Sequence, residues 1–391
     1  MAGSALNGTR AALERALSPE LFDLFDERFV RSCELLEAYI SCLAATVFRT
    51  TGLEQACAQP ANVEEAVRRA GLAPGAALVP ASWLLRTLAA GGRVARLHDD
   101  RYRANPGLAL PDASAIVDEQ SRHDPRCLPS YRIAALAADE YPAVLQGGVA
   151  GEDALFAPDH IGTWIEYFSN ANPMYAIANA VGCLAVEHAL PAHAAQVLEL
   201  GGGLGSGAEA LLARLESAGG PDRFDAYLFT DIVPPFLRRA KKALTARFPA
   251  APLRFAWMDM DEPFAKAAVA PGSCALVYAV NALHVARDLG ATLAQVREAL
   301  VPGGALVIAE CVRPFADRPL HVEFVFNLLG AFRAPTLVPG WRPNGGFLTP
   351  EQWTGALEAN GFGSVAICPD IAALRDAFPS FLVAAITARR A

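Results

Sequence analysis

The chain has 391 residues and a mass of 41.3 kDa, and 53% of its residues are hydrophobic while 19% are charged. This length exceeds the usual size of a single domain, and the apolar content excludes a disordered chain. The formal net charge of -8 argues against nucleic acid as a partner, because phosphate binding requires clustered cations.

The eight cysteines are scattered without a CxxC pair, which indicates neither a zinc site nor a disulfide framework. The longest apolar runs, such as residues 38–48, are much shorter than the roughly 18 residues of a membrane span. The N-terminus also lacks a basic and then apolar leader. We therefore expect a cytoplasmic protein with free thiols, no metal site and no membrane partner.

The N-terminal part has the apolar spacing of helices, the first of which begins at Ser18, a residue that can cap it. Residues 62–105 then predict a helix, a turn, a second helix and two short strands, which is the outline of a winged helix. The second helix offers only Arg86 as a cation, so packing, dimerisation and a wall for the substrate site are favoured over DNA binding. We assign residues 1–112 to this helical, winged-helix-like domain.

A linker is expected at residues 106–111, followed by a helical connector over residues 113–190 that covers the active site. From residue 191 onward, short apolar runs alternate with helical segments, a pattern typical of an α/β sheet with helices on both faces. We predict a Rossmann-like sheet of seven strands, mostly parallel, with an antiparallel last strand. The expected strands lie at residues 196–200, 226–230, 253–258, 274–280, 305–310, 365–367 and 381–386.

The first of these strands runs directly into a glycine-rich loop in which Gly201, Gly203 and Gly205 alternate with other residues. Glycines permit a sharp turn and the close approach of a ligand. A related pattern binds the pyrophosphate of dinucleotides. Here, however, the carboxylate of Glu199 would repel phosphates and attract an ammonium, so an amino-acid moiety is favoured over a dinucleotide.

The next two strands end near carboxylates. Asp231 can accept hydrogen bonds from both hydroxyls of a ribose, and Asp259 is placed near an adenine amino group, with Met258 or Met260 against the adenine face. Each aspartate taken alone is also compatible with a solvated helix cap. Together with Glu199 they outline a nucleoside that carries an amino acid.

This arrangement resembles the class I S-adenosylmethionine-dependent methyltransferases, over a region from about residue 190 to the C-terminus that we assign to one domain, residues 191–391. The resemblance implies S-adenosylmethionine as the cofactor. A nicotinamide-dependent dehydrogenase is the alternative that Glu199 disfavours. The implied cofactor-binding residues are Glu199, Gly201, Gly203, Gly205, Asp231, Ile232, Asp259, Met260 and Asn281.

A more specific resemblance lies in residues 276–310, where a strand ending in Asn281 is followed by Leu-His, Arg-Asp-Leu, a helix, Pro-Gly-Gly and a strand ending in Glu310. This segment is similar to the carbon-methylating domains of modular polyketide synthases and their free-standing relatives. Residues 141–175 resemble the helical segment that precedes the glycine loop of that family. The loop differs from the family at Leu204, where threonine is usual, and the N-terminal part instead resembles small-molecule O-methyltransferases.

His284 follows the fourth strand and Glu310 ends the fifth, so both are expected at the edge where open parallel sheets bind their ligands. A carboxylate beside an imidazole fixes its tautomer and makes it a better base. In the resembling family this pair removes a proton from a carbon flanked by carbonyls, which implies His284 as the base and Glu310 as its orienting residue. An ordinary capping role for His284 is the alternative.

A long insertion, residues 321–353, is expected to cover the active site. Arg313 and Arg333 are candidates to bind a substrate carboxylate, and core packing is an equally good explanation of Phe324 and Trp341. The predicted substrate-binding residues are Tyr175, His321, Phe324, Asn327, Arg333 and Trp341.

The leading hypothesis is a free-standing carbon methyltransferase of specialised metabolism, acting beside a carbonyl in a 2-oxo acid or a β-keto thioester. The acceptor would be a small molecule or a carrier-bound acyl chain, and the protein a homodimer. O-methylation of a phenol or carboxylate, again with His284 as base, is the second hypothesis. A scaffold that retains a nucleoside fold without catalysis is disfavoured by the presence of His284 and Glu310.

Overall fold

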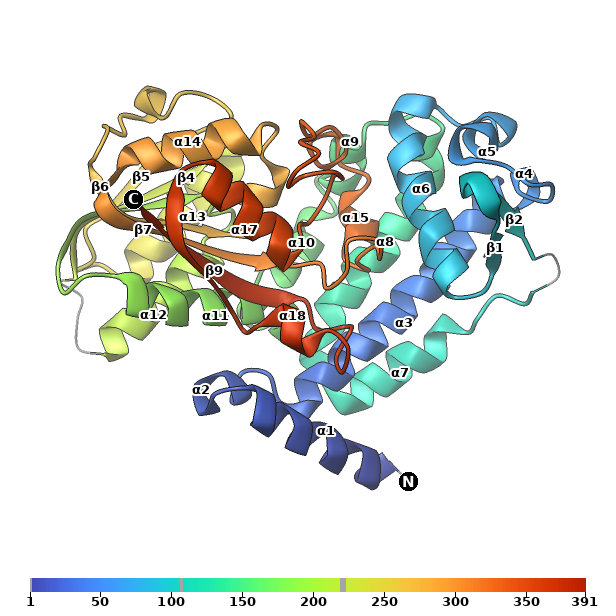
Figure 1. Cartoon of the computed structure of the whole chain (residues 1–391), viewed down its shortest axis with the longest axis horizontal. Coiled ribbons are helices and arrows are strands. Elements are labelled where there is room, and N and C mark those ends of the chain that lie inside the picture. The colour runs from blue at the N-terminus through green and yellow to red at the C-terminus, as the bar shows by residue number, and fades with distance from the viewer. Residues whose placement is uncertain (1, 106–107, 219–222) are drawn as a thin grey trace. The chain divides into compact units, whose positions relative to one another are not determined.

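The computed structural model divides the chain into two units, neither of which is continuous in sequence (Figure 1). We call them the sheet unit (Met1–Glu27, Phe168–Pro314 and Pro335–Ala391) and the helical unit (Arg28–Tyr167 and Phe315–Ala334). The structure describes residues 2–105, 108–218 and 223–391. Pro106 and Gly107, the first residues of the predicted linker, lie outside the described residues.

Among the described residues, seven strands of the sheet unit form one sheet in the order β5-β4-β3-β6-β7-β9-β8. The five strands from β5 to β7 are parallel, and β9 runs antiparallel to both of its neighbours. This confirms the predicted sheet, including its antiparallel last strand. The strands are β3 (Ala194–Leu200), β4 (Phe224–Asp231), β5 (Leu253–Trp257), β6 (Cys274–Val280), β7 (Leu300–Cys311), β8 (Phe362–Cys368) and β9 (Val383–Arg390).

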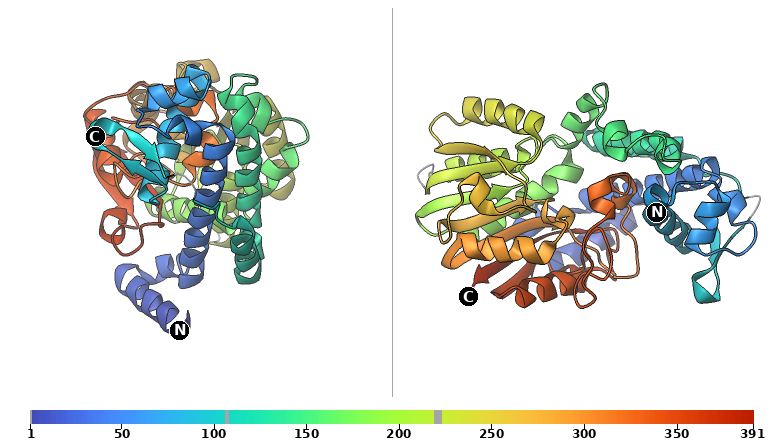
Figure 2. Two further views of the ribbon diagram at one scale, coloured as in Figure 1. Left: turned by 90° about the vertical axis from the view of Figure 1, so that its right-hand side faces the viewer. Right: turned by 90° about the horizontal axis from the view of Figure 1, so that it is seen from above.

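Helices cover both faces of this sheet, which lies between the yellow α13 on one side and the orange α14 and red α17 on the other (Figure 2, right). α11 packs on β6, β7 and β9 and against α12. The helical segments expected between the strands are found as α12, α13, α14 and α17. Their bounds are α11 (Pro173–Ala189), α12 (Ser206–Ser217), α13 (Pro234–Arg247), α14 (Leu289–Ala299) and α17 (Pro350–Ala359).

Short polar caps set where two of these helices begin. The Asp288 carboxylate accepts a hydrogen bond from the Ala291 N–H at the start of α14. Thr349 and Gln352 form a reciprocal capping box at the start of α17. The other helices of the sheet unit, in the part of the chain that the structure describes, are α1 (Ala2–Ala16), α2 (Pro19–Phe22), η3 (Phe264–Ala267), η4 (Leu283–Val285) and α18 (Ile371–Leu374).

The helix predicted to begin at Ser18 is short. It ends at Phe22, and the next helix starts at Glu27. Among the described residues, the Ser18 side chain finds no capping partner. Between the two helices the chain turns so that Phe25 is fully buried, with its ring centroid 4.4 Å from that of Phe381. Tertiary packing of Phe25 therefore interrupts a continuous helical pattern.

The helical unit is organised around α3 and α8, whose Tyr39 and Tyr131 rings lie 4.7 Å apart in its core. The predicted order of helix, turn, helix and two strands is found as α5, α6, β1 and β2. Its elements are α3 (Glu27–Thr50), α4 (Leu53–Ala56), α5 (Val63–Arg69), α6 (Pro74–Ala90), β1 (Val94–Arg96), η1 (His98–Asp100), β2 (Tyr102–Ala104), α7 (Ala113–His123), η2 (Pro125–Cys127), α8 (Leu128–Leu145), α9 (Gly151–Leu155), α10 (Ile161–Tyr167), α15 (Glu323–Phe326) and α16 (Gly330–Arg333).

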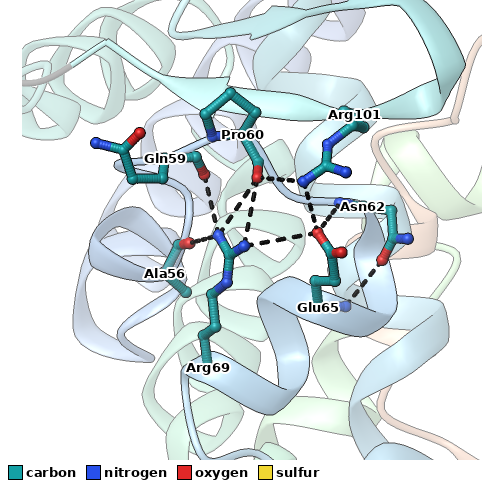
Figure 3. Close-up of polar contacts among 7 residues, drawn as sticks. All are labelled: Ala56, Gln59, Pro60, Asn62, Glu65, Arg69 and Arg101. Atoms are coloured by element: carbon teal, nitrogen blue, oxygen red, sulfur yellow. Dashed lines mark hydrogen bonds and ion pairs between the residues drawn. The ribbon is translucent and has the colours of Figure 1, made fainter.

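Two arginines near the β1–β2 hairpin hold the turn between α4 and α5 (Figure 3). Arg69 donates to the backbone carbonyls of Ala56 and Pro60, at 3.1 and 3.4 Å. Arg101 donates to the same Pro60 carbonyl at 2.7 Å and to the Glu65 carboxylate at 2.9 Å. Both arginine side chains therefore bind acceptors that belong to the helical unit itself.

The segment predicted as a connector, residues 113–190, is shared between the units, because α7 to α10 pack with the helical unit whereas α11 packs on the sheet. The predicted boundaries at residues 112 and 190 therefore do not coincide with the units of the structure. No helix in the described part of the chain is both long enough and apolar enough to cross a membrane.

Candidate functional site

The loop between β3 and α12 has the backbone conformation that only glycine adopts easily. Gly201, Gly203 and Gly205 have φ values of 62°, 57° and 92°. A Cβ atom added to Gly201 would lie 2.7 Å from the Cβ of Ala282, on the loop after β6. Among the described residues, no heavy atom comes within 4 Å of a Cβ atom added to Gly203. The loop thus packs closely on one side and is open at Gly203, where a ligand can approach the backbone.

Glu199 lies beneath this loop and is 1% exposed. Its Oε2 atom accepts a hydrogen bond from the Tyr227 hydroxyl at 2.9 Å. Burial raises the pKa of Glu199 to about 8. A nearby cation would favour the ionised form.

Asp231, at the end of β4, is 6% exposed and binds the glycine loop directly. Its Oδ2 accepts from the Gly203 N–H at 2.8 Å and its Oδ1 from the Val233 N–H at 2.7 Å. Burial raises the pKa of this carboxyl group. Each carboxylate oxygen can accept a further hydrogen bond, so both remain able to receive ribose hydroxyls.

Two large apolar side chains stand out into solvent beside Asp231. Ile232 is 49% exposed and Trp257, at the end of β5, is 50% exposed. The Trp257 indole N–H donates to the Ile232 carbonyl oxygen at 2.8 Å. The sequence predicted Ile232 as a cofactor residue but not Trp257, whose only signal was an aromatic residue at the end of a strand next to the predicted adenine-binding segment.

The other predicted cofactor residues are placed around this edge. The Asp259 carboxylate accepts from the Asp261 N–H at 2.9 Å, and the Met260 Cε atom is 3.6 Å from a Cβ atom added to Gly201. Asn281 has a positive φ of 46°, and its side-chain oxygen accepts from the Cys311 N–H at 3.2 Å. Asn281 therefore joins the ends of β6 and β7.

The structure brings His284 and Glu310 together at this same edge. His284 Nδ1 lies 2.7 Å from Glu310 Oε2, and the two residues are 5% and 0% exposed. Glu310 Oε1 accepts from the Ala282 N–H at 3.0 Å and from the His284 N–H at 3.4 Å. Because Nδ1 is occupied by the carboxylate, Nε2 is the ring nitrogen that can take a proton from a ligand.

Part of the insertion that was predicted to cover the active site lies against His284. We call residues 335–349 the strap. The Phe347 ring centroid is 4.2 Å from that of His284. Arg342 donates through Nη2 to the His284 carbonyl and through Nη1 to the Ala286 carbonyl, both at 2.7 Å. No pattern in the sequence distinguishes Arg342 from an exposed surface arginine.

Two predicted substrate residues and one candidate anion ligand belong to the sheet unit. Tyr175, on α11, meets the Phe168 ring edge-on at 5.1 Å, and burial raises the pKa of its hydroxyl. Trp341, in the strap, lies near α14 and α17, since a Cβ atom added to Gly290 or Gly355 would be 3.7 or 3.3 Å from its side chain. Arg313 is 5% exposed and donates to the Gly345 carbonyl at 3.1 Å.

The other four predicted substrate residues belong to the helical unit. Phe324 is fully buried, stacked on Tyr141 with a centroid distance of 4.7 Å, which agrees with the packing explanation. Arg333 donates to the carbonyls of Asn327 and Leu328. His321 is buried, and burial lowers the pKa of its imidazole. The structure thus distributes the predicted substrate residues over both units.

Comparison with known proteins gives the class of this site. Residues 198–306, which contain the glycine loop, Asp231 and His284, match the family model described as a methyltransferase domain. The chain carries a methyltransferase domain. Its fold is of class I, as predicted from the sequence.

Relatives of the methyltransferase domain occur inside much larger proteins. The highly reducing polyketide synthase ausV of Aspergillus calidoustus is 29% identical over 224 residues, which are 57% of this chain and 8% of that protein. The highly reducing polyketide synthase NEC1 of Pyricularia oryzae is 33% identical over 177 residues, or 44% of this chain and 6% of that protein. The chain therefore spans less than a tenth of the length of these relatives.

Among solved structures, the CurJ carbon methyltransferase has a similar fold over both units. The match covers 99% of each chain with a TM-score of 0.79 and 21% sequence identity. This similarity establishes the fold of the methyltransferase domain together with its N-terminal helical part.

Proposed function

We propose that this chain transfers a methyl group from S-adenosylmethionine to an enolisable carbon between two carbonyls, as found in a β-keto thioester. The observation that carries the proposal is the buried pair of His284 and Glu310, which lie 2.7 Å apart. His284 is on the loop that packs against the glycine loop at Gly201, and Glu310 is at the end of β7. A carboxylate acceptor is already ionised at neutral pH and needs no base, whereas a carbon acid does.

The residues around the glycine loop fit the cofactor. The open backbone at Gly203 can receive its amino-acid part, and the oxygens of Asp231 can accept from its ribose. Ile232 and Trp257 offer exposed apolar surfaces to an adenine. Asp259 and Met260 are the further candidates for adenine contacts, and Glu199 supplies a buried negative charge when it ionises.

In the proposed reaction His284 Nε2 accepts the proton from the carbon of the acceptor, and the electron pair of that C–H bond is delocalised onto the flanking carbonyl oxygens. Glu310 then stabilises the imidazolium through Nδ1. When bound, S-adenosylmethionine supplies a methyl group on a positively charged sulfur. The carbanionic carbon forms the new C–C bond, and the electron pair of the broken S–C bond stays on sulfur.

The arginines favour a β-keto thioester over a 2-oxo acid. A 2-oxo acid carries a carboxylate that needs a cationic partner. Arg313 and Arg333, the candidates for that role, each donate to backbone carbonyls within their own units. The two relatives named above are polyketide synthases, and this also supports a thioester acceptor.

Carbon NMR with methyl-labelled cofactor tests the proposal. The protein is incubated with carbon-13-methyl S-adenosylmethionine and, separately, with a β-keto thioester, a 2-oxo acid and a phenol. We expect a carbon-bound methyl signal with the thioester. An oxygen-bound methyl on the phenol, with no carbon-bound product, would overturn the proposal and assign the chain to O-methylation.

A further inference from the structure

Arg342 stands out among the charged residues of the strap because its side chain is 1% exposed and points at the backbone of the catalytic loop. We infer that Arg342 is a positioning residue, which holds the loop of residues 282–286 so that His284 faces the acceptor carbon. This inference rests on the proposed function of His284.

The hydrogen bonds of Arg342 match the loop closely. Its two terminal nitrogens reach the carbonyls of His284 and Ala286, two residues apart, at 2.7 Å each. A guanidinium offers such a rigid pair of donors, whereas a lysine ammonium is a single point of charge on a flexible stem. The Arg342 backbone is itself fixed, because it exchanges hydrogen bonds with Val338 at 2.7 and 2.9 Å.

The loop is held from two sides. Glu310 accepts from the N–H groups of Ala282 and His284, and Arg342 donates to the carbonyls of His284 and Ala286. The loop itself contributes only one short turn of helix, η4 (Leu283–Val285), whose internal bonds cannot fix its direction alone. The position of His284 therefore depends on its partners outside the loop.

Arg342 occupies a costly environment for a side chain whose only role is packing. Its guanidinium donates to neutral carbonyls, and within the part of the chain that the structure describes its Nε has no hydrogen-bond partner. Burial lowers the pKa of Arg342 to about 10, although Asp261, Asp288 and Glu310 act in the opposite direction. An apolar side chain would fill this space without that desolvation cost.

The test compares Arg342→Lys and Arg342→Gln with Arg375→Lys, a control arginine of the sheet unit that donates to the Pro314 carbonyl at 3.0 Å. We expect each Arg342 variant that remains folded to lower kcat by on the order of tenfold to a hundredfold, with an unchanged affinity for S-adenosylmethionine. The acid limb of the pH profile of kcat should also shift, because the His284 imidazole is no longer held in one position. The control should keep the kcat and pH profile of the parent protein.

Nitrogen-15 NMR of the His284 imidazole, assigned with His284→Gln, separates this inference from the proposed function. The parent protein should show one tautomer, protonated on Nδ1, and the Arg342 variants a mixture. A parent-like tautomer and pH profile in a folded Arg342 variant would overturn the inference even if carbon methylation is observed. A changed tautomer without any carbon-methylated product from the parent protein would support the positioning role while contradicting the proposed function.

Discussion

At the scale of single residues, the proposed chemistry depends on which nitrogen of His284 is available to a ligand. Glu310 binds Nδ1 at 2.7 Å and also accepts from the backbone of the same loop, so the carboxylate fixes both the ring and its support. The resemblance of residues 276–310 was enough to predict this pair. The contact with Phe347 and the bonds to Arg342 could not be predicted, because they depend on how the strap folds back onto the loop.

Replacing the base should separate catalysis from cofactor binding. We predict that His284→Ala lowers turnover by on the order of a hundredfold or more, the usual scale for loss of a general base. Its affinity for S-adenosylmethionine should remain that of the parent protein. Steady-state kinetics and calorimetry check this, with the exposed His188→Ala on α11 as the control. Unchanged turnover would contradict the role of His284.

Unlike His284→Ala, Asp231→Asn should weaken the binding of the cofactor. The amide keeps the size of the side chain but offers one acceptor oxygen instead of two, so it cannot hold both backbone N–H groups and the ribose. We predict a loss of cofactor affinity of at least about tenfold, corresponding to one charged hydrogen bond. Asp225→Asn, a replacement of an exposed residue on the same strand, is the control. Normal affinity in Asp231→Asn would show that this carboxylate does not bind the cofactor.

The raised pKa of Glu199 predicts how stability depends on pH. Its folded-state pKa of about 8 lies above the ordinary value of 4.5 for a glutamate, so the folded protein binds this proton more tightly than the unfolded chain does. The contribution of Glu199 to stability is therefore greatest at low pH and declines as the pH rises from about 4.5 to 8. Denaturation of Glu199→Gln across this range should show a weaker decline than the parent protein, and equal slopes would contradict the assignment.

At the scale of elements, the sheet was predictable because strands buried on both faces are continuous apolar runs such as residues 274–280. The glycine loop was predictable because its spacing has a conformational cause, the positive φ values at Gly201, Gly203 and Gly205. The end of the helix that starts after Ser18 was not predicted, since the burial of Phe25 against Phe381 interrupts the helical pattern there. Such packing involves residues more than 350 positions apart, beyond the reach of local periodicity.

The contact between the glycine loop and the catalytic loop can be tested with matched glycines. Gly201 and Gly272 have φ values of 62° and 63°, but only a Cβ atom at Gly201 meets a neighbour, the Cβ of Ala282 at 2.7 Å. We predict that Gly272→Ala costs about 1 kcal/mol of backbone strain, whereas Gly201→Ala costs more and also lowers turnover. Thermal unfolding and kinetics measure both. Equal effects on stability and turnover would contradict the proposed link between the loops.

At the scale of the whole molecule, the sequence predicted a sheet domain and a helical domain but not how the chain is divided between them. The predicted segments followed sequence order, whereas the structure assigns residues 315–334 to the helical unit and the N-terminal residues to the sheet unit. The reason is physical: the Tyr141 hydroxyl donates to the Phe324 carbonyl at 2.6 Å, and Phe324 packs in the core of the helical unit. A long insertion can therefore carry a piece of one unit inside the sequence of the other.

Proton exchange at the acceptor carbon tests the central claim most directly, because it isolates the step assigned to His284. A β-keto thioester is incubated in deuterated buffer with the protein and S-adenosylhomocysteine, so that no methyl group can be transferred, and loss of the α-proton signal is followed by NMR. We predict that the parent protein accelerates the exchange and that His284→Ala exchanges no faster than buffer alone. Equal acceleration by both proteins would contradict the assignment of His284 as the carbon base.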